Sequence, residues 1–172
     1  MNHPLPTAVI PPLDDVAVAP VDIETFGIRL VDGSPVARVE RTVLASGEPD
    51  DCAAASIGLL PAASPDAVLH STSWRWTEGR VVLTYVCCPD PLPGLAHAVI
   101  TPAHDHPAVV DPTQPSASRP SPNQVLHHGI DHLAWLADHH PTLVECSRAA
   151  HPLLWDRLMQ AGRHRAGQFP HH

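Results

Sequence analysis

Alternating apolar and polar positions mark the first half of this chain as β-structure. Four such segments occur in pairs around turn-forming residues: 26–30 and 36–44 around 32–35, then 68–76 and 80–88 around 77–79. Alternation with a period of two is typical of strands with one buried face, and two such segments around a turn predict a β-hairpin. The loop Thr77-Glu78-Gly79 ends in glycine, which favours a type I turn closed by a G1 bulge, with Gly79 at positive φ. Residues 95–100 are a candidate edge strand.

Helical periodicity replaces alternation near the C-terminus. A helix is predicted from about Asn123, the expected N-cap, to His139, and Pro141 prevents its continuation. A second helix begins near there and either kinks or restarts at Pro152. A short helix over residues 52–60 follows Pro49 and two acidic residues, which is a helix-start signal.

Together these elements predict an α+β fold. We expect a mostly antiparallel sheet of about four or five strands that carries a short helix and is covered by two C-terminal helices. We also expect a proline-rich arm over residues 1–20, a single domain over 21–165 with a proline-rich loop at 107–123, and a tail at 166–172. A chain of 172 residues with 44% hydrophobic residues suffices for one core.

Charge and composition exclude several classes of function. The formal net charge of −8 argues against non-specific nucleic-acid binding, which requires a basic surface. All ten basic residues are arginine, as a GC-rich genome favours, so Schiff-base chemistry and the lysine-containing phosphate loop are excluded. No apolar run approaches the ~18 residues of a membrane helix. The first residues do not resemble a signal peptide, and the four cysteines lack metal-ligand spacing, so we expect a cytoplasmic protein with reduced thiols.

One stripe of the predicted C-terminal helix carries candidate chemistry. His128, His132, Trp135 and His139 share a face, because their spacing follows the helical turn. The apolar stripe lies opposite, and we expect it to be buried: Leu126, Ile130, Leu133 and Ala137.

Two histidines four residues apart on a helix can bind one transition metal such as zinc or iron, as in the His-Glu-x-x-His pattern. Here the glutamate is missing after His128, so the metalloprotease base is absent. A third ligand beside His128 and His132 is available from His139, or from His104 or His106. The alternative is a histidine face that only meets water.

Aromatic residues of the first strand in the second hairpin are candidate ligand-binding residues. Strict alternation places His70, Thr72, Trp74 and Trp76 on one face. Two tryptophans on one strand face either anchor the core or form a stacking wall for a planar ligand. Together with Trp135 on the helix, His70, Trp74 and Trp76 predict a binding cleft between sheet and helix.

Residues 47–54, Gly-Glu-Pro-Asp-Asp-Cys-Ala-Ala, resemble the opening of a Nudix box, with a Gly-Glu pair, a short acidic spacer and a small-residue helix. The family's metal-binding Arg-Glu-x-x-Glu-Glu core is replaced here by residues 55–60, Ala-Ser-Ile-Gly-Leu-Leu. The resemblance therefore implies a fold that retains ligand binding without pyrophosphatase activity, with Glu48 alone matching a functional position.

Three functions compete. The first is a non-catalytic accessory module that binds a small molecule or a protein, which we favour because no complete catalytic set can be assembled. The second is a metal-dependent, hydrolase-like enzyme that uses His128 and His132. The third is a degenerate Nudix-like ligand-binding protein.

Overall fold

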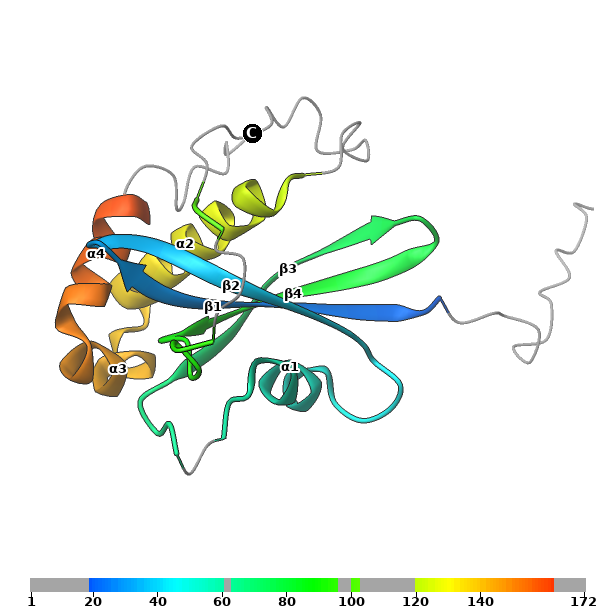
Figure 1. Ribbon diagram of the computed structural model, residues 1–172, viewed down its shortest axis with the longest axis horizontal. Coiled ribbons are helices and arrows are strands. Elements are labelled where there is room, and N and C mark those ends of the chain that lie inside the picture. The colour runs from blue at the N-terminus through cyan, green and yellow to red at the C-terminus, as the bar shows by residue number, and fades with distance from the viewer. Residues whose placement is uncertain (1–18, 61–62, 96–99, 103–119, 163–172) are drawn as a thin grey trace, which may run out of the picture.

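The computed structural model describes residues 19–60, 63–95, 100–102 and 120–162. A four-stranded sheet with the order β2-β1-β4-β3 forms its centre. Helices α2 and α4 lie on one face of this sheet and α1 lies on the other (Figure 1). The strands are β1 (Val21–Val31), β2 (Ser34–Val43), β3 (Val68–Thr77) and β4 (Arg80–Cys88). The predicted α+β class is confirmed.

Both predicted hairpins are present, with tighter turns than expected. Strand β3 pairs antiparallel with β4, and Thr77 pairs directly with Arg80, so the turn holds only two residues. These are Glu78 and Gly79, with φ of 51° and 79°. Two positive φ values define a type I′ turn, whose twist matches that of the strands better than the predicted type I turn with a G1 bulge. The β1–β2 hairpin turns in the same way, through Asp-Gly at residues 32–33.

The two hairpins join through a parallel pair, β1 beside β4. The sheet is therefore mixed, although two of its three strand pairings are antiparallel as predicted. Most of the predicted edge strand at 95–100 lies outside the described residues. Its last residue, Ile100, bridges to Ala37 of β2 through two backbone hydrogen bonds of 2.9 Å.

Helix α2 (Pro122–His139) packs its apolar stripe on the sheet. The four stripe residues are at most 3% exposed, which confirms the predicted face: Leu126, Ile130, Leu133 and Ala137. Ser121, not the predicted Asn123, is the N-cap, and it forms a capping box with Gln124. Gly129 lets the helix approach β4 closely, because a Cβ there would lie 2.5 Å from Cγ1 of Val86.

The helical structure after α2 is interrupted at Pro141 and again at Pro152, the two prolines predicted to end or restart a helix. It contains a 3-10 turn η2 (Pro141–Leu143), α3 (Glu145–Ala150) and α4 (Pro152–Gly162). The helix thus restarts at Pro152 rather than kinking. Trp155 of α4 is buried and donates its indole N–H to Ser147 of α3 at 2.9 Å.

Helix α1 (Pro49–Ile57) begins at the predicted proline and covers part of the opposite sheet face. Its Ala53 packs with Ile23 and Tyr85 in a second, smaller core. The adjacent cysteines of β4 point to opposite faces of the sheet. Cys88 belongs to the α2 core, whereas Cys87 pairs with Leu69, which packs in the smaller core. The expected N-terminal arm and C-terminal tail lie almost entirely outside the described residues, as does most of the 107–123 loop.

Candidate functional site

The predicted histidine stripe lies on the side of α2 that turns away from the core. His128 and His139 are exposed, whereas His132 and Trp135 are half-buried. Another histidine, His70 of β3, approaches the stripe from the sheet. The ring of His132 lies 4.5 Å from that of His128 and 6.0 Å from that of His70, measured between centroids.

Burial favours the neutral form of two histidines in this cluster. Burial, with smaller contributions from the neighbouring His128 and His70, lowers the pKa of His132 to about 4. Burial also lowers the pKa of His70. Neutral imidazole is the form that binds metals. Nevertheless, no group of three metal-ligating side chains that could hold an ion occurs among the described residues.

His139, the expected third ligand on the helix, belongs to a different contact. Its ring stacks on Trp135 at a centroid distance of 4.9 Å, and its Nδ1 lies 2.9 Å from the Trp135 carbonyl oxygen. The described residues thus do not group His139 with His128 and His132 as metal ligands, and its role as a ligand stays a prediction. His104 and His106 lie outside the described residues.

The tryptophans of β3 do not face the histidines. Ser71 pairs with Tyr85 but Ser73 pairs with Thr84, so Thr72 forms a β-bulge. One extra residue reverses the alternation that follows it. His70 opposes Val86 in the α2 core, while Trp74 opposes Leu83 in the α1 core.

The predicted cleft that combines Trp74 and Trp76 with His70 and Trp135 is consequently wrong. The core-anchor interpretation of the two tryptophans is wrong as well, since Trp74 is 71% exposed and Trp76 is 60% exposed. They extend over the sheet face that carries α1, beside Leu83 and Val81. We call Trp74, Trp76, Val81 and Leu83 the tryptophan face.

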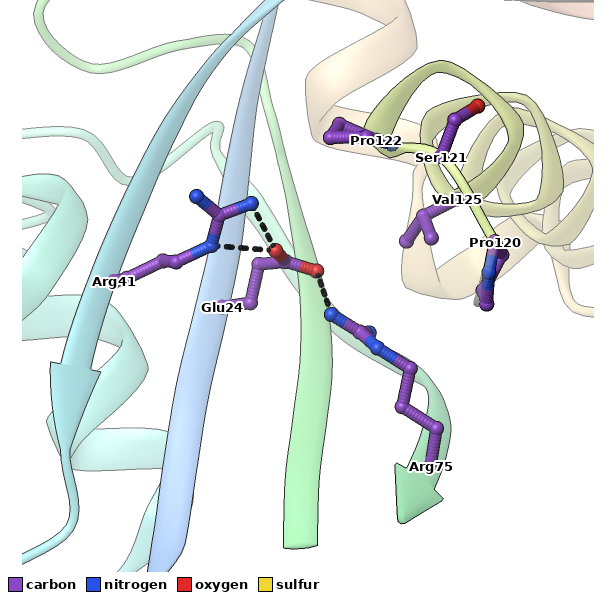
Figure 2. Close-up of a pocket in the computed structure, with 7 residues that line it drawn as sticks. All are labelled: Glu24, Arg41, Arg75, Pro120, Ser121, Pro122 and Val125. Atoms are coloured by element: carbon purple, nitrogen blue, oxygen red, sulfur yellow. Dashed lines mark hydrogen bonds and ion pairs between the residues drawn. The ribbon is translucent and has the colours of Figure 1, made fainter. Parts of the chain in front are cut away.

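A second feature, missed by sequence reasoning, lies on the α2 side of the sheet (Figure 2). Glu24 of β1 is almost completely buried and binds two arginines, one from the adjacent strand β2 and one from β3, which lies beyond β4. Its Oε1 accepts from Arg41 Nε at 2.8 Å and Nη2 at 2.6 Å, and its Oε2 accepts from Arg75 Nη2 at 2.7 Å. These side chains form one wall of a hollow of about 260 Å³, which we call the arginine hollow. Four residues at the start of α2 form the facing wall: Pro120, Ser121, Pro122 and Val125.

A second charged cluster joins the sheet to α1. Asp90 has a fully buried carboxylate that accepts from Arg29 Nη1 at 2.9 Å and from Arg38 Nη2 at 2.8 Å. Arg38 also donates to the carbonyl oxygen of Ile57 at the end of α1. Arg38 is only 1% exposed, and this burial is possible because Asp90 compensates its charge. Because the charged groups of this cluster are bonded to one another, we assign the cluster a role in packing α1 against the sheet.

The buried thiols offer little for nucleophilic catalysis. Burial raises the pKa of Cys87 to about 12 and raises that of Cys88 also. A thiol is a nucleophile only after deprotonation, so both stay protonated and unreactive near neutral pH.

No protein-family model, curated protein or solved structure matches this chain. The resemblance to a Nudix box therefore stays a prediction. None of the helices in the described part of the chain is both long and apolar enough to span a membrane.

Proposed function

We propose that this chain is a non-catalytic protein-binding module and that its interface is the tryptophan face. The observation that carries the proposal is the exposure of Trp74 and Trp76, 71% and 60%, at alternate positions of one strand. A tryptophan side chain loses a large apolar area from water when a partner covers it, and tryptophans are enriched among residues that dominate binding energy. Folding does not require two exposed tryptophans at alternate positions of one strand.

The position of β3 favours an extended partner. Strand β3 lies at an edge of the sheet, and none of the described strands pairs with the outer side of its backbone. The other edge, β2, is partly paired by Ile100 and contains Pro35, which cannot donate a hydrogen bond. From Ser73 to Thr77, β3 is regular and free of proline. These features support addition of a partner strand along β3.

Charge favours a basic partner. Three exposed acidic residues, Glu48, Asp50 and Asp51, surround the start of α1 on the sheet face that carries the tryptophans. The arginines of that face within the described residues, Arg29 and Arg38, are both bonded to Asp90. A partner segment that alternates apolar and basic side chains would satisfy the acids and place cations over the indole rings.

A labelled peptide that alternates valine and arginine tests this proposal by fluorescence anisotropy. We expect saturable binding to the wild-type chain and a loss of at least about tenfold in affinity when Trp74→Ser and Trp76→Ser are combined. A peptide of valine and glutamate should bind less tightly. The matched control is Leu143→Ser, because Leu143 is 64% exposed in η2, away from β3.

All three substitutions are on the surface, so the thermal midpoint should change little and the comparison reports on binding. Equal binding by the double variant and the wild type would refute the tryptophan face as the interface. Equal loss in Leu143→Ser would show that the effect is not specific to it.

A further inference from the structure

The arginine hollow has an unbalanced charge. It contains one carboxylate, Glu24, and two guanidinium groups, Arg41 and Arg75. Both oxygens of Glu24 are already engaged by these arginines. The three side chains together therefore carry one net positive charge on a chain whose formal net charge is −8.

One donor of this pair of arginines is left without an acceptor. The Nε of Arg75 is buried and has no hydrogen-bond partner within the described part of the chain. A buried donor without an acceptor is unfavourable, so an incoming acceptor would be stabilised there. Arg41 is bonded to Glu24 through Nε and Nη2, and its side chain is 60% exposed. In Figure 2 its Nη1 points away from both Glu24 and the facing wall, so Arg41 contributes positive charge to the hollow.

The facing wall of the hollow is mostly apolar. Pro120, Pro122 and Val125 line it at the start of α2, together with Ser121. The positive end of the dipole of this 18-residue helix lies at the same place. The wall thus offers apolar contact beside a region of positive potential.

We propose that the arginine hollow binds a small organic carboxylate with a short apolar body. Guanidinium groups match carboxylates in geometry, and a single negative charge balances the net charge of the three side chains. The apolar body would contact the two prolines and Val125. A phosphate dianion fits less well, because it would bring two negative charges next to Glu24. The hollow, at about 260 Å³, is slightly smaller than pockets for drug-sized ligands, which start at about 300 Å³, so it suits a small carboxylate. The proposal is independent of the tryptophan face.

Butyrate is the probe, and NMR of the arginine Nε–H groups is the readout. We expect butyrate to shift the Arg75 resonance saturably, whereas butanol and sodium chloride at the same concentration do not. Arg41→Gln should weaken butyrate binding by about tenfold, the loss of one charged interaction. The control Arg148→Gln removes the same charge from an exposed residue of α3 and should leave binding unchanged.

Several results would overturn the proposal. They are a linear, non-saturating response to butyrate, an equal response to butanol or chloride, and equal weakening by both substitutions. Tighter binding of inorganic phosphate than of butyrate would refute the carboxylate as the ligand class. Because Arg41 is largely exposed and Glu24 keeps Arg75, the fold should survive Arg41→Gln, which the dispersion of the spectrum checks directly.

Discussion

Gly129→Ala tests whether α2 packs on the sheet as closely as described. A Cβ at this position would lie 2.5 Å from Cγ1 of Val86, far inside van der Waals contact. Val86 is fully buried in the α2 core, and its β-branched side chain has few alternative rotamers. The helix or the valine must therefore move to accommodate one methyl group.

Two opposing effects set the magnitude. Overpacking of a core destabilises by about 1–3 kcal/mol, while replacing glycine by alanine inside a helix stabilises by about 1 kcal/mol. We expect a net loss of up to about 2 kcal/mol in the free energy of unfolding, and a thermal midpoint lower by up to about 4–8 °C for a chain of this size. Urea unfolding and thermal denaturation followed by circular dichroism measure both quantities.

A double-mutant cycle identifies the cause. Val86→Ala removes the methyl group that would clash, so adding Gly129→Ala to it should be neutral or stabilising, with an interaction energy of about 1 kcal/mol or more. Gly94→Ala is the control, since no atom of the described residues lies within 4 Å of a Cβ there, and it should change stability by less than about 0.5 kcal/mol. If Gly129→Ala stabilises the wild-type chain by the full helix propensity, the close approach of α2 to β4 is wrong.

Three further predictions concern the stripes and turns. Leu133→Ala should destabilise by about 2–5 kcal/mol in urea unfolding, because Leu133 is fully buried; near-normal stability would contradict its place in the core. Gly79→Val should lower the thermal midpoint, at a cost of about 1 kcal/mol or more, since its φ is 79°; an unchanged midpoint would argue against the type I′ turn. The lowered pKa of His132 means that the folded chain binds fewer protons than the unfolded chain, so stability should fall as the pH falls from 6.5 to about 4. Discounted for partial exposure, this loss is about 1–2 kcal/mol, and His132→Gln should flatten the pH dependence.

Patterns that span a few residues were sufficient to predict most secondary structure. The hairpin around Glu78 and Gly79, the buried stripe of α2 and the restart at Pro152 follow from periodicity, turn residues and proline, each of which acts locally. These features depend on the chain's own backbone preferences and on one amphipathic face.

The candidate sites were decided by tertiary structure. A single unpaired residue, Thr72, moved Trp74 and Trp76 to the face opposite His70, because every residue after a bulge changes sides, and no local signal marks such a bulge. The arginine hollow requires Glu24 and Arg75, 51 residues apart, and the parallel pairing of β1 with β4 brings their strands into reach. Arg38 and Asp90 are likewise 52 residues apart. Charged side chains in strands are expected in water, and only the folded chain determines which of them meet a partner that permits burial.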